Sequence, residues 1–189
     1  SNKEIYIIAE IGNNHQGSVK HAMKLIKSAK DAGANAVKTQ KRDNKSLYTK
    51  TFFNQVYDNP NSFAQTYGEH REKLELNKSD YKDLVEYSKE VEIDFFATPF
   101  DLNSLDFLEE FNFKSYKIAS ADITNTILQT EIAKTKKEIF LSTGGATLDD
   151  VKRAKENIFK HNEKLTIMQC TASYPVKIDN MNLKVLETY

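Results

Sequence analysis

Short runs of β-forming residues alternate with longer amphipathic segments along the chain, and this alternation limits the fold more than any other feature. The expected strands are Ile5–Ile11, Ala36–Gln40, Asp94–Thr98, Ser115–Ile118, Glu138–Ser142 and Leu165–Cys170. The expected helices between them are Val19–Ala32, Ser79–Val91, Leu102–Phe111, Ile127–Lys134 and Leu148–Phe159. Strand–helix–strand repetition predicts a parallel sheet whose strands are joined by helices packed outside it.

Residues that favour helix ends flank several of these helices. Ser18, Ser79, Asp101 and Thr147 stand where helices are expected to begin, and their side chains suit the N-cap position. Gly33 stands where the first helix is expected to end, because glycine adopts the left-handed backbone found just past helix ends.

Six strand–helix repeats fit two architectures, a doubly wound open sheet and a TIM-type (β/α)8 barrel of which about the first six repeats are present. A complete barrel takes about 250 residues, more than the 189 of this chain. Residues 41–78 form the one long connection, and barrels place substrate loops after strands in this way. The chain ends at Asn182–Tyr189, which fits the first turns of a sixth helix. On the barrel interpretation, residues 1–189 are one partial catalytic domain.

Charge and cysteine content exclude several classes of partner. Lys+Arg and Asp+Glu both number 27, so the chain has no overall field to attract nucleic acid or an anionic membrane. No apolar run approaches the roughly 20 residues needed to span a bilayer. A single cysteine, Cys170, excludes an internal disulfide framework and favours a cytoplasmic location, and we expect it to be a small core residue.

Polar side chains stand at the carboxyl ends of the expected strands, where a buried parallel strand is normally apolar. They are Glu10, Lys38, Gln40, Thr98, Lys117, Ser120, Ser142, Thr143, Gln169 and Thr171. In a barrel, all of these positions gather at one mouth, which is where barrel enzymes have their active sites.

The two lysines are the most informative of these residues. Lys38 and Lys117 lie inside strands, and a buried ammonium group is costly without an anion nearby. Two ammonium groups that face one cavity also repel each other. A bound phosphate or carboxylate would remove both costs, with hydroxyl donors from Thr98, Ser120 and Ser142.

Other interpretations of these residues stay open on the sequence alone. In one, Glu10 forms a structural ion pair with one lysine and the other lysine points outward. In another, a lysine forms a Schiff base as in aldolases. His15, in the loop after the first strand, fits a loop-stabilising role as well as a catalytic one, and the other histidines show no metal-ligand spacing.

The same positions carry motifs that resemble the sialic acid (N-acetylneuraminate) synthase family. Six motifs occur in the order found in that family, namely Ile8–His15, Ala32–Gln40, Thr98–Phe100, Tyr116–Ser120, Leu141–Gly144 and Cys170–Pro175. Tyr67–Arg71 and Leu74–Leu76 resemble the family's insertion after the second strand. Together the motifs span nearly the whole chain, and they favour the barrel over the open sheet.

The resemblance implies condensation of phosphoenolpyruvate with an N-acetylmannosamine-type sugar, which gives a nine-carbon 2-keto acid sugar and phosphate. The residues expected to bind phosphoenolpyruvate are Lys38, Thr98, Lys117, Ser120 and Ser142. Gln40 and Tyr174 are expected to face the sugar, and Glu10 to act near the reacting carbons as an acid/base or water-orienting group. A divalent metal, Mn²⁺ or Mg²⁺, is expected to orient and polarise the sugar aldehyde.

This chain departs from the family pattern in two ways. Ala172 stands where members often carry Asn or Ser. The family's metal-binding histidines lie on the seventh and eighth strands, and a C-terminal antifreeze-like domain completes the partner subunit's site in a homodimer. Neither is found here, so we expect no metal site within this chain, and little activity from it alone.

Two alternatives remain beside the sialic acid synthase interpretation. One is a related synthase that makes legionaminic or pseudaminic acid, and the motifs around Asn13–His15 and Gln40 fit the sialic or legionaminic branch better. The other is a non-catalytic module that binds phosphorylated ligands without turnover.

Overall fold

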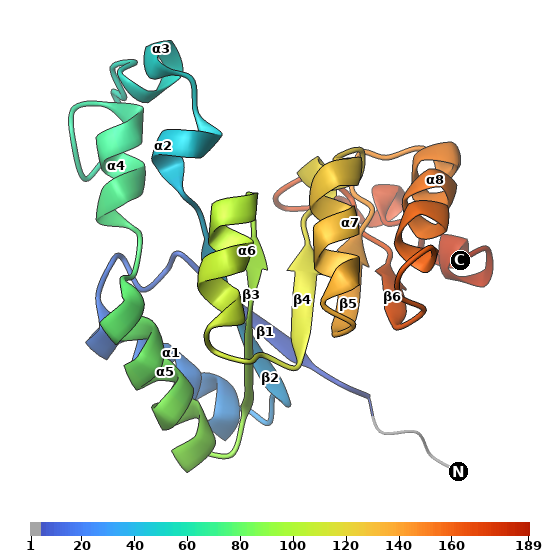
Figure 1. Ribbon diagram of the computed structural model, residues 1–189, viewed down its shortest axis with the longest axis horizontal. Coiled ribbons are helices and arrows are strands. Elements are labelled where there is room, and N and C mark those ends of the chain that lie inside the picture. Colours follow the sequence, from blue (N-terminus) through green and yellow to red (C-terminus); the bar gives the residue numbers. More distant parts are fainter. Residues whose placement is uncertain (1–4) are drawn as a thin grey trace.

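The strands of the computed structural model, which describes residues 5–189, form one parallel sheet (Figure 1). They are β1 (Ile8–Gly12), β2 (Ala36–Lys41), β3 (Asp94–Pro99), β4 (Ser115–Ile118), β5 (Glu138–Ser142) and β6 (Leu165–Met168). Their order in the sheet is the order along the chain, β1 to β6. In a doubly wound sheet, the order of the strands reverses at a switch point, so that strands next to each other in the sheet are not all consecutive in sequence. The unbroken order therefore excludes that alternative, and the six strands form a curled partial barrel of the TIM type.

The five expected helices are present, and they pack outside the sheet as the strand pattern predicts. They are α1 (Val19–Asp31), α5 (Lys78–Glu90), α6 (Leu102–Glu109), α7 (Thr126–Lys134) and α8 (Leu148–Phe159). The predicted N-caps at Ser18, Asp101 and Thr147 are confirmed, since each side chain accepts a hydrogen bond from a first-turn amide. Gly33 follows the end of α1 with a φ of +88°, as expected.

The predicted cap at Ser79 is wrong. The N-cap of α5 is Asn77, whose side chain accepts from the amides of Ser79 and Asp80. The Asp80 carboxylate in turn accepts from the Asn77 amide at 2.9 Å and completes a capping box. This reciprocal pair stabilises a start two residues earlier than the serine would give.

The long connection after β2 folds into three short helices. They are α2 (Asn44–Leu47), α3 (Lys50–Phe53) and α4 (Tyr67–Lys73). Edge-to-face and tilted ring contacts hold them together, with Tyr67 contacting Tyr48, Phe52 and Tyr57 at centroid distances of 4.8–5.3 Å. Figure 1 shows these helices together beyond the carboxyl end of β2, so the insertion lies on the side of the barrel mouth.

Two end regions differ from the sequence expectation. β1 begins at Ile8 rather than Ile5, and β6 ends at Met168 rather than Cys170. Residues after β6 form the 3₁₀ turns η2 (Ile178–Asn180) and η3 (Leu183–Glu187) where an α-helix was expected, and η1 (Ser120–Asp122) is a third such turn after β4. Every helix within residues 5–189 falls short of the length and apolarity needed to cross a membrane.

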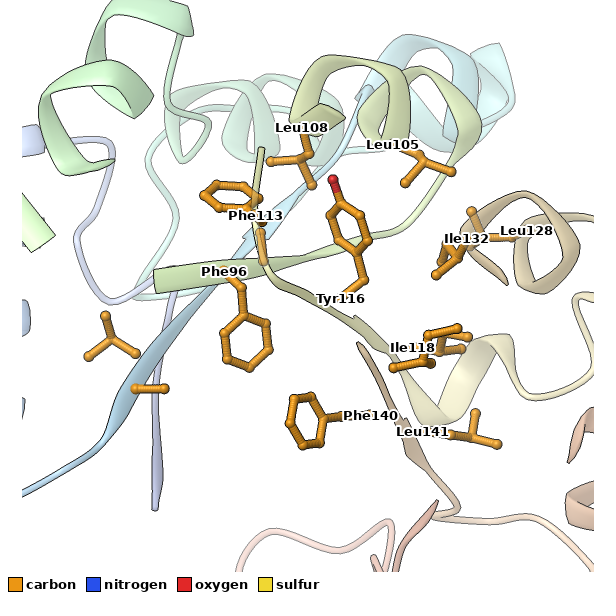
Figure 2. Packing of buried hydrophobic residues seen from close by; sticks show 14 of the residues in the cluster. Phe96, Leu105, Leu108, Phe113, Tyr116, Ile118, Leu128, Ile132, Phe140 and Leu141 are labelled. Atoms are coloured by element: carbon orange, nitrogen blue, oxygen red, sulfur yellow. The ribbon is translucent and has the colours of Figure 1, made fainter. Parts of the chain in front are cut away.

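The buried hydrophobic residues form one cluster with members on both faces of the sheet (Figure 2). On the outer face, strand residues such as Tyr116 and Ile118 pack against helix residues such as Leu108. On the inner face, the rings of Phe96 and Phe140 stack with centroids 5.6 Å apart. Side chains two apart in a strand share a face. The aromatic pair therefore forms a floor directly beneath Thr98 and Ser142, the next inward residues of β3 and β5.

Candidate active site

The carboxyl ends of the strands surround a cavity of about 490 Å³. All eight residues predicted for the site line it: Glu10, Lys38, Gln40, Thr98, Lys117, Ser120, Ser142 and Tyr174. The curl of the sheet is what brings residues from both ends of the chain to one cavity. Their joint position is thus a property of the fold, and their individual roles stay predictions.

Lys38 is buried at the bottom of this cavity and has a carboxylate partner. The β1–β2 register sets Glu10 opposite Lys38, and Nζ of Lys38 lies 2.7 Å from Oε2 of Glu10. The ammonium also donates to Oγ1 of Thr98 at 2.7 Å and to the Thr39 carbonyl at 3.1 Å. Burial lowers the pKa of Lys38, and the Glu10 charge partly offsets that shift. The predicted ion pair of Glu10 with one lysine is therefore present.

Lys117 is different, because its neighbours are neutral. Its ammonium donates to the Ile118 carbonyl at 2.8 Å and to the Ser142 hydroxyl, and no carboxylate of residues 5–189 comes within 4.0 Å of it. Burial, helped by the charge of Lys38, lowers the pKa of Lys117 to about 8. The idea that the second lysine points outward is wrong, since strand alternation turns Lys117 into the cavity beside Ser142.

Small groups complete the β4–β6 side of the cavity. The Ser120 hydroxyl accepts from the Gly144 amide at 2.9 Å. A side chain at Gly144 would meet Ser120 Oγ at 3.1 Å and the Ala172 amide at 3.3 Å, so the close approach of three segments favours a glycine. Cys170 was expected in the core, but it is half-buried past the end of β6, lines the cavity and donates to Ser142 at 3.3 Å.

The opposite side contains a contact network that the sequence did not predict. Gln40 accepts from Nη1 of Arg42 at 2.8 Å, and the Arg42 guanidinium stacks 3.5 Å from the ring centroid of Phe100. Phe100 and Gln40 both line the cavity. A side chain at Gly12, whose φ is +49°, would lie 3.5 Å from the Gln40 amide nitrogen. The position of Arg42 two residues after Gln40 was the available signal for their contact.

His15 and Tyr174 take contrasting positions. His15 is 1% exposed, and its Nδ1 accepts from the Gly17 amide at 3.1 Å. Burial lowers its pKa to about 4, so it is neutral near pH 7 and stabilises the loop after β1. Tyr174 is 99% exposed at the rim of the cavity, where its ring is free to meet a ligand.

The described residues do not fit the metal that the resemblance implies. Within residues 5–189, no three His, Cys, Asp or Glu side chains come together in an arrangement that would hold an ion. No chemical step on this chain is therefore assigned to a metal.

Comparison with known proteins gives consistent results. A family model described as "NeuB family" matches residues 25–189. N-acetylneuraminate-9-phosphate synthase of Mus musculus is 33% identical over 97% of this chain and 51% of its own length. N,N'-diacetyllegionaminic acid synthase of Campylobacter jejuni is 38% identical over 98% of this chain and 57% of its own length.

A solved structure with a similar fold agrees with these sequence matches. The crystal structure of an N-acetylneuraminic acid synthetase from Leptospira borgpetersenii superposes with a TM-score of 0.85 and 30% identity, covering 100% of this chain and 61% of that one. This chain spans about half the length of the curated relatives it matches. From the family match and these relatives, we conclude that the chain belongs to the NeuB family.

Proposed function

We propose that the intact protein condenses phosphoenolpyruvate with an open-chain N-acetylmannosamine-type sugar to give a sialic (nonulosonic) acid and phosphate. The names of its relatives describe synthases of such acids. The observation that carries the proposal is that the buried ammonium group of Lys38 and the half-buried one of Lys117 line one cavity, with Glu10 as the carboxylate that pairs with Lys38. A small molecule with several negative charges would balance that excess.

In this proposal the lysines bind the anionic end of phosphoenolpyruvate. Lys38 and Lys117 hold its phosphate and carboxylate, and the hydroxyls of Thr98, Ser120 and Ser142 supply further hydrogen bonds. Thr98 and Ser142 already contact the two ammonium groups, so the cradle is largely formed without ligand. Such preorganisation reduces the reorganisation needed at the moment of reaction.

The proposed reaction balances as follows. The enol π electrons of phosphoenolpyruvate form a bond from its carbon 3 to the aldehyde carbon of the sugar, and the aldehyde oxygen gains a proton. Water then adds at carbon 2 and loses one proton, which balances the proton gained by the aldehyde oxygen. The hydroxyl at carbon 2 loses its proton and forms the keto group as the bond from carbon 2 to the phosphate oxygen breaks, and phosphate leaves with the electron pair and takes up that proton. Glu10 is suited to orient the water or transfer a proton, because its side chain lines the cavity, is 51% exposed, and has only Oε2 paired with Lys38.

The sugar is proposed to lie between Gln40 and Tyr174, on the other side of the reacting carbons. Gln40 offers its amide nitrogen, since its oxygen already accepts from Arg42. Tyr174 offers an exposed ring at the rim. The identity to the Campylobacter jejuni enzyme makes a legionaminic-type, N,N'-diacetylated sugar the second candidate substrate.

The proposal also covers the metal, the oligomeric state and the cellular location of the intact protein. We propose that the intact protein requires Mn²⁺ or Mg²⁺, held by residues beyond those present here, to polarise the aldehyde. We also propose a cytoplasmic homodimer.

The test is phosphate release from phosphoenolpyruvate by the intact gene product. Release should require both an N-acetylhexosamine and a divalent metal. Lys38→Ala and Lys117→Ala should each lower kcat/KM for phosphoenolpyruvate at least about 100-fold, the scale seen when a preorganised electrostatic contact is lost. Lys114→Ala removes an exposed lysine just before β4 and should stay near wild type.

Near-normal rates in both cavity variants would overturn the proposal. Tight binding of phosphoenolpyruvate without any turnover would instead support a non-catalytic binding module.

A further inference from the structure

Arg42 lies next to the active-site cavity and contacts two of the residues that line it. Its Nη1 donates to Oε1 of Gln40 at 2.8 Å, and its guanidinium carbon lies 3.5 Å from the ring centroid of Phe100. Gln40 and Phe100 line the active-site cavity, whereas Arg42 lines a neighbouring cavity of about 280 Å³. Arg42 can therefore act on a ligand in the active-site cavity through these two side chains.

The main chain is held on both sides of Arg42. The Phe100 amide donates to the Lys41 carbonyl at 3.1 Å, so the segments after β2 and β3 stay side by side beyond the sheet. The Asp43 amide donates to Oδ2 of Asp101 at 2.8 Å. These bonds fix the backbone from which the Arg42 side chain starts, before any ligand binds.

The chemistry of the guanidinium decides which end of the Gln40 amide faces it. An arginine side chain has hydrogen-bond donors and no acceptor, so only the amide oxygen of Gln40 can bond to it. The amide nitrogen lies 3.5 Å from the position that a Gly12 side chain would take, and Oε1 of Glu10 lies 3.2 Å from the same position. Gln40 is thus held with its N–H donors on the side of Glu10.

The contact with Phe100 restricts the arginine as well. A guanidinium favours the face of an aromatic ring, which limits the directions in which its N–H groups can point. Arg42 is half-buried, and this burial lowers the pKa of its guanidinium. Because water has limited access to the group, its hydrogen bond to Gln40 has less competition.

We propose that Arg42 is a positioning residue, which holds the oxygen of Gln40 so that the Gln40 N–H groups face an acceptor oxygen of the sugar. This inference rests on the proposed function, in which the sugar lies between Gln40 and Tyr174. Without Arg42, the amide can rotate and offer its oxygen to the sugar instead. An oxygen there would repel the lone pairs of an acceptor, so the sugar would bind more weakly.

The test is a double-mutant cycle in the intact protein, with KM measured for N-acetylmannosamine and for phosphoenolpyruvate. Arg42→Met should raise KM for the sugar by about 3- to 10-fold, the range for one hydrogen bond, and leave KM for phosphoenolpyruvate unchanged. In the Gln40→Ala background, Arg42→Met should have no further effect, because its partner is gone. Lys45→Met removes a nearby exposed cation and should leave both KM values unchanged.

Two further variants test the direction of the amide. Gln40→Glu keeps an oxygen for Arg42 but has no N–H donor, so it should raise KM for the sugar at least as much as Gln40→Ala does. Arg42→Lys keeps a donor for the Gln40 oxygen and should recover part of the loss seen in Arg42→Met. It also takes the place of Arg42→Met in the cycle if that variant fails to fold. Additive effects in the cycle, or a Gln40→Glu variant close to wild type, would overturn the inference.

The side-chain amide resonances of Gln40 separate this inference from the proposed function. In isotope-labelled intact protein, they are the pair of N–H signals that Gln40→Ala removes. The pair should shift in Arg42→Met and stay in place in Lys45→Met. If the wild type releases no phosphate while the signals shift as expected, the proposed function fails and the positioning contact is supported. Phosphate release with signals that do not shift in Arg42→Met would leave the proposed function intact and overturn the inference.

Discussion

The two sides of the cavity hold a lysine in different surroundings. On the β1–β3 side, Lys38 is paired with Glu10 and hydrogen-bonded to Thr98. On the β4–β6 side, Lys117 has the Ile118 carbonyl and the Ser142 hydroxyl, both neutral. The same side chain on the same inward face therefore has a carboxylate that partly compensates its charge in one place and only neutral partners in the other.

The difference indicates which lysine has its charge compensated within the fold and which depends on a bound anion. The Glu10 carboxylate offsets part of the cost of burying the Lys38 ammonium before any ligand binds. A buried ammonium with neutral partners lowers stability until an anion arrives, and enzymes commonly retain such groups at their sites. We infer that Lys38 is largely fixed before binding and that Lys117 gains more from an anionic substrate.

The largest effect is predicted for a substitution at Glu10. Removing this carboxylate would leave Lys38 with neutral partners only, as Lys117 has on the β4–β6 side. Glu10→Gln should lower kcat by about 10²- to 10⁴-fold, the range for loss of a positioned acid or base. KM for phosphoenolpyruvate should stay the same or fall, because a negative charge next to Lys38 is removed. Steady-state kinetics of the intact protein at saturating sugar separate the two parameters.

A kcat within about threefold of wild type would mean that Glu10 is only the counter-ion of Lys38, since acid–base loss costs far more. A large rise in KM with unchanged kcat would instead mean that the ion pair positions Lys38 for binding.

The next prediction concerns stability without ligand. Lys117 has a pKa of about 8 in the fold against about 10.4 in an unfolded chain. Between these values the unfolded state binds more protons, so the unfolding free energy should rise with pH, and below pH 8 the full cost applies. Lys117→Met removes the cost and should raise the unfolding free energy at pH 7 by roughly 1–3 kcal/mol.

Urea unfolding at pH 7 and pH 9.5 measures this effect, and the wild type should approach the variant at the higher pH. Lys114→Met is the control, because that exposed lysine has a raised pKa from Asp94 and should leave the pH slope over this range unchanged. A clear loss of stability in Lys117→Met at pH 7 would show that the neutral partners already compensate the ammonium, and the contrast between the two sides would disappear.

Much of the barrel could be predicted from local sequence patterns, and the exceptions have identifiable causes. Strand–helix alternation and period-two spacing were enough to find six strands and five helices and to turn the polar residues to one mouth. The insertion helices were missed, because four-residue segments such as α2 and α3 have no detectable period. The start of α5 was misplaced because the reciprocal bonds of Asn77 and Asp80 outweigh a nearby serine.

The residues that line the cavity were easier to predict than the contacts that they make with one another. Lys38 and Lys117 look equivalent in sequence, and only the β1–β2 register sets Glu10 opposite the first of them. Phe100 is far from Arg42 along the chain, so nothing local pointed to the stacking of the guanidinium on that ring. Pairings of this kind depend on register and loop geometry, which composition and spacing do not specify.

The smallest predicted effect tests whether the neutral partners on the Lys117 side act only as packing. Cys170 donates to the Ser142 hydroxyl, which also accepts from Lys117. Cys170→Ala should change KM for phosphoenolpyruvate by less than about threefold, since a thiol is a weak donor and even an ordinary hydrogen bond contributes only about 0.5–1.5 kcal/mol. Ser142→Ala is the matched comparison and should have a larger effect, because it removes the partner of Lys117 itself. If the Cys170 variant lost as much as Lys117→Ala, the thiol would have to contact the substrate directly, and the β4–β6 side would hold its anion through sulfur as well as nitrogen.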